Sequence, residues 1–376
     1  MKIVYIRTSN IYDDSRATKE IMALAEQGYK VHVLGWNRDG TAEKCSNEVF
    51  SRYSELVSFD FYDCLVDGGI GIKNINKLLV WFKWTYKKIK LMNRIDIIHA
   101  CNLDAALGVY KFAKKHKIKL VYDIYDYYID SHSIPKLIEH LVENLEIKVI
   151  NLADATIICT EERKEQISKS KPQNLTIIHN SPEVNKISSV VCKYDYAYCG
   201  SLFDQRLLKE IFCEYPQYKN ISFAIAGYGE YENLVKQLDS NYERFKYYGS
   251  VTYDKVLCIE NMSKVISAIY KPTIRNHRLC APNKFYEALA LAKPVIVCKG
   301  TGIDKIIEKY NAGIVIEYSA EEFFKALEYL INSPQICEEM GKNARKLYEN
   351  NYKWSIMKER LVQLYIKLDN SQNGVD

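Results

Sequence analysis

The chain contains no apolar run long enough to span a bilayer, and its first residues, MKIVYIRTSN, enter a predicted strand without a signal-peptide pattern. Its 11 cysteines form no CxxC pair and no His/Cys cluster with the spacing of a zinc site. Several lie in apolar runs, such as Cys159 in TIICT, which indicates buried reduced thiols. We therefore expect a cytoplasmic protein.

Other signatures are missing as well. No GxGxxG turn follows the first predicted strand, which disfavours a dinucleotide oxidoreductase. The net charge of +5 is mild and no long basic run stands apart from the fold, so charge does not indicate nucleic-acid binding. No internal repeat or low-complexity segment is evident. What remains is a 376-residue chain with 48% hydrophobic and 26% charged residues, which is enough for two soluble domains.

The most informative stretch is APNKFYEALALAKPVIV, residues 281–297. Pro282 suits the first turn of a helix, and Lys293-Pro294 ends the helix before a β-branched strand. Unpaired N–H groups and the dipole make a helix N-terminus a seat for a diphosphate, and Lys284 adds a cation there. Glu287, one turn on, could accept hydrogen bonds from ribose hydroxyls. An ordinary αβ unit with a surface Lys and Glu is the alternative.

The first half of the chain predicts a βαβ start, with strands at 2–6 and 31–34 and a helix at 17–26. Residues 73–94 predict a basic amphipathic helix that contains no acidic residue. We place one set of its apolar residues in the core and expect Val80, Trp84 and Leu91 to point elsewhere among lysines. Such a surface suits anionic lipid, and a solvated basic face is the alternative. The set expected in the core is Ile75, Leu78, Leu79, Phe82, Tyr86 and Ile89.

Polar residues follow two further strands, predicted at 96–100 and 119–122, where open parallel sheets place ligands. Asn102 and Asp104 follow the first, and Asp123 and Asp126 follow the second. These aspartates could orient a sugar hydroxyl or cap the next helix. Their spacing is not that of an Asp-x-Asp metal clamp, so no metal site is expected.

The second half repeats one pattern, a short apolar strand followed by a glycine. A glycine in that place lets a ligand approach the backbone closely. The strands at 196–199, 223–226 and 245–248 all end this way, and each signal is weak alone. The residues at these exits are Gly200, Ser201, Gly227, Val251 and Tyr253.

The segment from Asn283 to Ile296 resembles the GT-B glycosyltransferases of group 1, family four. Their Asn-Lys-aromatic-x-Glu-Ala segment precedes Lys-Pro-Val-Ile, as it does here. The resemblance covers nearly the whole chain and implies an α/β fold of two Rossmann-like, doubly wound domains facing a central cleft. It implies an acceptor-side domain at 1–184, a nucleotide-sugar domain at 185–350, and a last helix at 351–376 that returns to the first domain.

The resemblance also implies roles for residues. Relatives hold the donor diphosphate with a basic pair, for which Arg206 is the better candidate here and Lys209 the weaker one. We take Asp123, Asp126, Arg206 and Lys284 as the catalytic candidates. The candidates for donor binding are Gly200, Ser201, Arg206, Lys209, Gly227, Val251, Tyr253, Asn283, Lys284 and Glu287. The candidates on the acceptor side are Arg16, Asn102 and Asp104, with a capping or surface role as the alternative for Arg16.

The resemblance implies transfer of a hexose-type sugar from a UDP- or GDP-sugar to a glycan or lipid-linked acceptor in cell-surface polysaccharide synthesis. It implies retention of configuration and no cofactor or metal. Two departures stand out, because Tyr125 replaces a histidine that touches the donor sugar and Leu279 replaces a glutamate. These departures keep an inactive partner subunit as an alternative, and a sugar-nucleotide epimerase of the same two-domain architecture is another.

Overall fold

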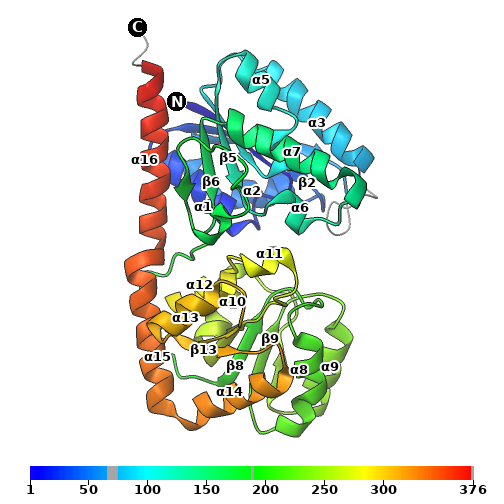
Figure 1. Cartoon of the computed structure of the whole chain (residues 1–376), viewed down its shortest axis with the longest axis vertical. Coiled ribbons are helices and arrows are strands. Elements are labelled where there is room, and N and C mark those ends of the chain that lie inside the picture. Colours follow the sequence, from blue (N-terminus) through cyan, green and yellow to red (C-terminus); the bar gives the residue numbers. More distant parts are fainter. Residues whose placement is uncertain (66–74, 188–189, 374–376) are drawn as a thin grey trace. The chain divides into compact units, whose positions relative to one another are not determined.

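A computed structural model describes residues 1–65, 75–187 and 190–373 (Figure 1). The chain forms two compact units, Met1–His179 with Met357–Asp376, and Asn180–Ile356. Each unit is built on one parallel β-sheet, which confirms the predicted α/β class with two doubly wound domains. In this division, unit 2 begins slightly before the boundary that we predicted after residue 184.

Unit 1 has a seven-stranded sheet in the order β3-β2-β1-β4-β5-β6-β7. Its central strands are almost entirely buried, as their near-continuous apolar sequences require. The strands are β1 (Lys2–Arg7), β2 (Lys30–Asn37), β3 (Val57–Asp63), β4 (Ile97–Cys101), β5 (Lys119–Ile124), β6 (Ala155–Ile158) and β7 (Thr176–Ile177).

Right-handed crossovers place the helices of unit 1 on two faces of this sheet. The chain moves one way through β1, β2 and β3 and the other way through β4, β5 and β6, so α1 and α2 cover one face and α3 to α7 the other. The helices are α1 (Ser15–Glu26), α2 (Ala42–Val49), α3 (Ile75–Lys90), α4 (Leu103–Ala106), α5 (Tyr110–Lys115), α6 (Tyr128–Ser131) and α7 (Lys136–Leu152).

The two faces of this sheet differ in chemistry. On the face of α3 to α7, aromatic and aliphatic side chains form an apolar core that includes Trp36, Trp81 and Tyr122. On the face of α1, the buried side chains include Glu20, His99 and Asp123, because residues adjacent in a strand point to opposite faces. Unit 1 therefore buries a charged cluster under α1.

The last helix, α16 (Trp354–Asn373), begins in unit 2, and from Met357 onward it belongs to unit 1. Its Tyr365 hydroxyl lies 2.7 Å from Nδ1 of the buried His99. Lys358 pairs with Glu26 of α1, and Arg360 donates to the carbonyl of Ile177 at 3.0 Å. These contacts fix the helix on the face that carries the charged cluster.

Unit 2 has a six-stranded sheet in the order β10-β9-β8-β11-β12-β13. Its strands are β8 (Tyr194–Cys199), β9 (Phe223–Ala226), β10 (Phe245–Tyr247), β11 (Ser263–Ala268), β12 (Val295–Cys298) and β13 (Gly313–Ile316). Its helices are α8 (Leu208–Glu214), α9 (Glu232–Asn241), α10 (Tyr253–Asn261), α11 (Arg275–Arg278), α12 (Asn283–Ala290), α13 (Ile303–Tyr310), α14 (Ala320–Asn332) and α15 (Pro334–Leu347).

The structure corrects two sequence expectations about helix α3. The core side of this helix consists of Leu78, Trp81, Thr85 and Ile89, whereas Ile75, Leu79 and Tyr86 are exposed. The expected outward Trp84 is half-buried and stacks on Trp81, with ring centroids 5.4 Å apart. The bulky Trp81 packs against the sheet. The helix is therefore rotated relative to the orientation that we predicted from its sequence. Lys73, where the helix was predicted to begin, lies outside the described residues.

Burial of a carboxyl group on α7 predicts that unit 1 loses stability as pH rises. Burial raises the pKa of Glu146 to about 8. Hydrogen bonds from the Tyr122 hydroxyl and the Tyr128 N–H lower this pKa, but they do not outweigh burial. Between its ordinary pKa and about pH 8 the unfolded chain releases this proton while the folded chain keeps it. The folded state therefore loses stability across that window, at up to about 1.4 kcal/mol per pH unit.

We expect Glu146→Gln to flatten this decline, because a neutral amide has no proton to release. The measurement is the free energy of unfolding in urea at pH 5 and at pH 8.5. Burial also raises the pKa of Glu20 to about 8, so part of the decline stays in the variant. Glu165→Gln, at an exposed site of the same unit, is the matched control. An unchanged slope in Glu146→Gln would contradict the assignment.

Candidate active site

The candidate donor site of unit 2 lies where the strand order reverses, between β8 and its neighbour β11. The carboxyl ends of parallel strands at such a point form the usual ligand crevice of open α/β sheets. The end of β8 leads to Gly200, and β11 leads through Tyr270 to α11 and α12. Helix α12 begins at Asn283, directly after Pro282 in extended conformation. The residues predicted for donor binding therefore surround one point of the sheet.

Gly200 and Gly227 let the backbone segments at this point come into close contact. The Gly200 N–H donates to the Ala226 carbonyl at 2.9 Å, and the Gly227 N–H donates to the Gly249 carbonyl at 2.8 Å. A Cβ atom on Gly227 would overlap the Gly200 carbonyl, and one on Gly200 would overlap the Lys284 ammonium. Glycine is thus required at Gly227, where backbone approaches backbone, whereas at Gly200 its missing side chain makes room for the flexible end of Lys284.

Lys284 presents its ammonium group beside these glycines. Its Nζ lies 4.7 Å from the ring centroid of Tyr198 in a cation–π contact. Burial by itself would lower the pKa of this ammonium, but Tyr198, Tyr270 and Glu287 outweigh burial and raise its pKa above the ordinary value. Lys284 therefore stays charged at any physiological pH.

Arg206 reaches the same place from the loop before α8. Its guanidinium carbon lies 5.2 Å from the ring centroid of Tyr270, and its Nε is buried with no hydrogen-bond partner among the described residues. Tyr198 and Tyr270 affect the pKa of both Arg206 and Lys284, so the two cations converge on one pair of tyrosines. Lys209, the weaker candidate, is exposed on α8. A buried N–H without a partner beside a second cation is a group that an anion can satisfy.

Carboxyl groups lie behind the two cations. Glu287 on α12 is buried and accepts a hydrogen bond from Tyr253, the first residue of α10. Glu260, on the same helix α10, is fully buried, and neither carboxyl oxygen has a hydrogen-bond partner among the described residues. Burial and the nearby Glu287 raise the pKa of Glu260 well above its ordinary value. Glu260 is therefore neutral, which leaves Glu287 as the acceptor in this cluster.

The remaining donor candidates lie at the rim of this cluster. Ser201 accepts a hydrogen bond from the Tyr198 hydroxyl through its carbonyl at 2.9 Å. Val251 packs against the small core that contains Cys199 and Ile259, and Asn283 is exposed at the start of α12. The roles of these side chains in donor binding stay predictions.

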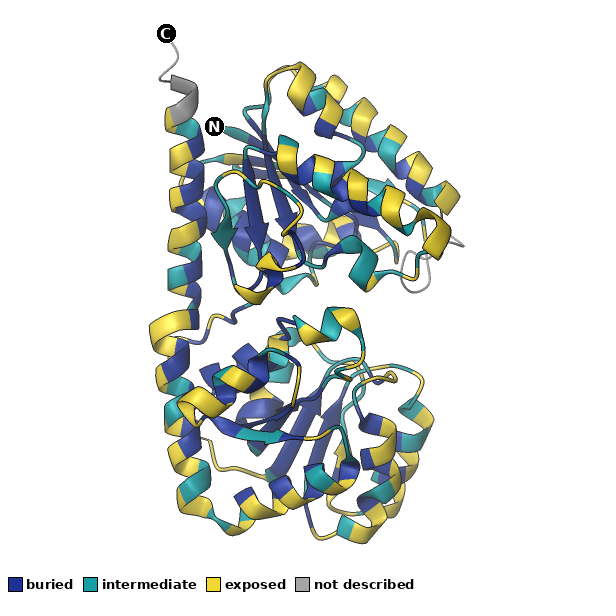
Figure 2. Ribbon diagram, in the orientation of Figure 1, coloured by how far each residue is buried: buried dark blue, intermediate teal, exposed yellow. Residues whose placement is uncertain are grey.

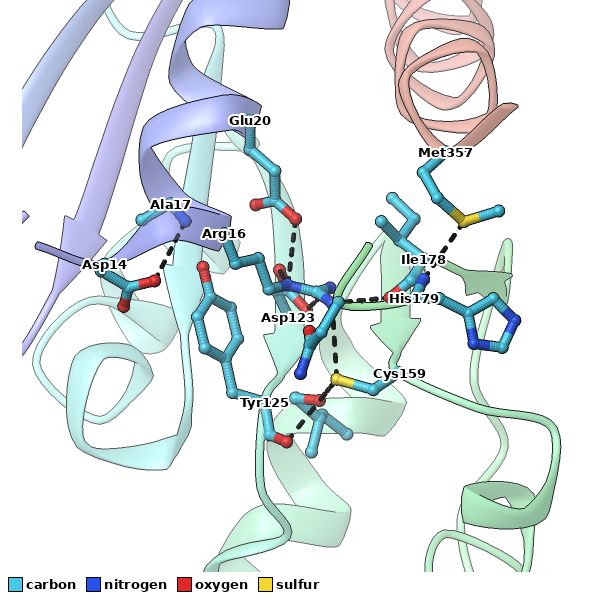
Figure 3. A network of polar contacts seen from close by, with 12 residues as sticks. Asp14, Arg16, Ala17, Glu20, Asp123, Tyr125, Cys159, Ile178, His179 and Met357 are labelled. Atoms are coloured by element: carbon cyan, nitrogen blue, oxygen red, sulfur yellow. Dashed lines mark hydrogen bonds and ion pairs between the residues drawn. The ribbon is translucent and has the colours of Figure 1, made fainter. Parts of the chain in front are cut away.

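In unit 1, Arg16 and Asp123 form a buried ion pair (Figure 3). The Arg16 Nη2 lies 2.8 Å from the Asp123 carboxylate, and its Nε lies 3.1 Å from Glu20. Its Nη1 donates to the Ile178 carbonyl at 2.6 Å. Arg16 is only 5% exposed and Asp123 is 0% exposed. Contact of Arg16 with an acceptor, or of Asp123 with a sugar, remains a prediction that requires this pair to open.

Asp126, Asn102 and Asp104 are arranged differently. The half-exposed Asp126 pairs with Arg163 at 3.0 Å. The Asn102 side-chain oxygen accepts from the Tyr125 N–H at 2.8 Å and so ties the end of β4 to the end of β5. Asp104 is buried and accepts from the Thr8 hydroxyl, and its other oxygen has no hydrogen-bond partner among the described residues. These contacts give Asn102 a structural role and leave Asp126 the most accessible of the three.

Tyr125 stands where the resemblance placed a histidine. Two guanidinium groups lie close to its ring, that of Arg7 at 4.2 Å and that of Arg16 at 4.7 Å from the ring centroid. Its hydroxyl lies 2.9 Å from the Tyr5 hydroxyl. Tyr125 thus makes contacts of its own here, in which one aromatic ring interacts with two cations.

One group of described residues, His99, Cys101 and Asp123, has the donor atoms and the spacing to hold a metal ion. All three are fully buried. Asp123 already pairs with Arg16, and His99 hydrogen-bonds to Tyr365. Because the Arg16 guanidinium would repel a cation at this place, the group is better explained as a structural ion-pair cluster.

Sequence reasoning missed Tyr198, Tyr270 and Glu260. The tyrosines lie in or just after strands, where an aromatic residue usually indicates packing. Glu260 carried a usable signal, since an acid on the apolar face of a short helix is rarely buried without a role.

The sequence of the chain matches two family models, "Glycosyltransferase Family 4" over residues 18–184 and "Glycosyl transferases group 1" over residues 198–347. The chain belongs to the group 1 glycosyltransferases. An uncharacterized glycosyltransferase of Haemophilus influenzae is 22% identical over 351 residues, which are 87% of this chain and 89% of that protein. Another, from Methanocaldococcus jannaschii, is 23% identical over 217 residues, 53% of this chain and 54% of its own length. The latter match thus spans about half of each chain.

Solved structures extend the similarity over the whole chain and support the predicted GT-B fold. Sucrose-phosphate synthase from Thermosynechococcus elongatus superposes with a TM-score of 0.72 at 12% identity, over 99% of this chain and 100% of that one. HepE from Anabaena, in complex with UDP, gives 0.67 at 12% identity over 98% and 100%. A putative UDP-N-acetylglucosamine 2-epimerase from Listeria monocytogenes gives 0.62 at 10% identity over 96% and 94%. Because the sequence identities are this low, the similarity to these structures is evidence for the fold of this group 1 chain only.

Proposed function

We propose that this group 1 glycosyltransferase moves a hexose-type sugar from a UDP- or GDP-sugar to a hydroxyl of a glycan or lipid-linked acceptor in cell-surface polysaccharide synthesis. The observation that carries the proposal is the convergence of Arg206 and Lys284 on Tyr198 and Tyr270, at the strand ends of unit 2. Two cations at the N-terminal end of α12 suit a pyrophosphate.

In the proposed reaction, the bond between the anomeric carbon and the donor phosphate oxygen breaks. A bond forms between that carbon and the acceptor oxygen, and the acceptor proton passes to the leaving phosphate. Retention of configuration is part of the proposal and rests on the family resemblance. Negative charge that develops on the leaving diphosphate is stabilised by Lys284, Arg206 and the first N–H groups of α12, with no cofactor or metal in the proposed step.

The recognition of the rest of the donor follows from the same cluster. Glu287 is the proposed acceptor for the ribose hydroxyls, held in place by Tyr253. Gly200 and Gly227 allow the Lys284 ammonium and the two strand ends to lie close together, which supports binding of a phosphate at this place. HepE, of the same fold, is titled as a complex with UDP, which supports a uridine nucleotide as the first ligand to test.

The test is a thermal-shift screen of the purified chain against UDP, GDP and a panel of nucleotide-sugars, followed by transfer assays with the stabilising donor. We expect one nucleotide class to raise the melting temperature and its sugar conjugate to be consumed when an acceptor is present. Consumption of the donor alone, with a product that keeps the nucleotide, would assign a sugar-nucleotide epimerase. Absence of any shift would favour an inactive partner subunit.

The acceptor is the least constrained part of the proposal. A lipid-linked acceptor would be met at a membrane surface, and the described residues contain no helix long and apolar enough to cross a membrane. Peripheral contact through the basic helix that we predicted at 73–94 is therefore part of the proposed function. The exposed lysines and apolar side chains of α3 support this part of the proposal.

A further inference from the structure

Helix α7 buries acidic residues and exposes apolar ones. Glu143 and Glu146 are 8% and 0% exposed, whereas Leu137 and Leu141 are 91% and 62% exposed. Ile138 and Leu145 are also exposed. An amphipathic helix on a soluble protein normally has the opposite orientation.

The contacts of the two glutamates fix this orientation. Glu146 accepts from the Tyr122 hydroxyl at 2.7 Å and from the Tyr128 N–H at 3.0 Å. Glu143 pairs with Lys169 at 2.7 Å. Rotating the helix to cover Leu137 and Leu141 would take Glu146 away from its two partners and expose the buried Val149 and Ile150, so these leucines face outward.

The neighbouring helices extend the surface. Helices α3, α5 and α7 cover the same face of the sheet, and α3 exposes Leu79, Val80 and Tyr86. The outward turns of α3 and α7 are exposed along their length (Figure 2). We call the outer sides of these three helices the basic apolar face.

The exposed charges of this face have one sign, although α7 also carries the half-buried Glu139. No acidic residue on the described parts of α3, α5 and α7 is exposed, and α3 and α5 contain none at all. The exposed lysines are Lys83, Lys87, Lys90, Lys111, Lys114, Lys115, Lys136 and Lys148. Exposed leucines among such lysines form an apolar surface with a charged rim, which is typical of a surface that binds a partner.

The combination of charge and apolar area selects the partner. A second copy of the chain would bring lysines against lysines, and a nucleic acid would not need leucines. An anionic bilayer offers acidic headgroups for the lysines and an acyl boundary for the leucines. We propose that the basic apolar face binds an anionic lipid surface, with Leu137 and Leu141 entering the boundary between headgroups and acyl chains. This deepens the membrane contact of the proposed function without depending on the reaction.

The test is sedimentation of the full chain with vesicles of phosphatidylglycerol and phosphatidylcholine, and with vesicles of phosphatidylcholine alone. We expect binding to the anionic vesicles that weakens in high salt. Leu137→Ser with Leu141→Ser, and separately Lys87→Glu with Lys90→Glu, should each weaken binding about tenfold or more. Lys219→Glu with Lys305→Glu, a matched charge change at exposed sites of unit 2, should not weaken it.

Several results would overturn the proposal. Failure to sediment with anionic vesicles would do so, as would binding that is insensitive to the leucine pair. A dimer in analytical ultracentrifugation that the leucine pair abolishes, without vesicle binding, would assign the face to a second copy. All the substituted side chains are exposed, so the circular dichroism and melting temperature of each variant should match the wild type. Vesicle binding is measured without donor or acceptor, so its failure is distinguishable from failure of the proposed reaction.

Discussion

We expect Lys284→Ala to lower the turnover of glycosyl transfer by about 10² to 10³-fold, with a smaller effect on the Michaelis constant for the donor. Charge on the diphosphate grows as the glycosidic bond breaks, so a fixed ammonium stabilises the transition state more than the ground state. The ammonium lies among Tyr198, Tyr270 and Glu287, where burial strengthens its field. The measurement is steady-state kinetics with the donor found by thermal-shift screening.

Two matched variants make this result specific. Lys284→Arg keeps the charge and should recover part of the turnover, although its longer group meets Gly200. Lys305→Ala removes an exposed lysine from α13 of the same unit and should leave the kinetics unchanged. Glu287→Gln should mainly raise the Michaelis constant, since ribose binding contributes equally to ground and transition states. Full turnover in Lys284→Ala would remove this residue from the site.

The second large effect concerns the stability of unit 1. We expect Arg16→Ala to lower its free energy of unfolding by about 3–5 kcal/mol, because Asp123 would lose the cation that compensates it in the interior and Glu20 would lose a buried partner. Both carboxyl groups are fully buried, and Arg16 also bonds the Ile178 carbonyl. The measurement is urea unfolding followed by the fluorescence of Trp36 and Trp81, which lie in the core of this unit.

The ionic origin of this loss can be tested by pH. In the wild type, burial raises the pKa of Asp123, but the charge of Arg16 outweighs burial and holds this pKa below its ordinary value. Without Arg16 the folded chain must protonate Asp123 or leave a bare charge, so the loss should be larger at pH 8 than at pH 5. Arg94→Ala, which breaks an exposed pair with Asp96, is the matched control and should change stability little. A loss in Arg16→Ala that is independent of pH would indicate lost packing instead.

Much of the fold could be predicted from local sequence signals. The strand at Phe223–Ala226 and the strand after Lys293-Pro294 appear where the β-branched and small apolar residues predicted them. Between β4 and β5 the chain forms two short helices, α4 and α5, with Gly108 between them. A Cβ at Gly108 would overlap the Thr85 hydroxyl of α3, so close helix packing explains the glycine and the break.

The α/β class, the two sheets and the family can be predicted from the amino-acid sequence, because each depends on patterns within a few residues or on a motif such as Asn-Lys-aromatic-x-Glu. The same patterns point to Lys284, Arg206 and Glu287. Other properties emerge only when the chain is folded: Tyr198 and Tyr270 bring the two cations together, Arg16 and Asp123 neutralise each other in the interior, and α7 exposes Leu137 and Leu141. The reason is that these properties depend on partners far apart in the chain, and periodicity along one helix or strand carries no information about them.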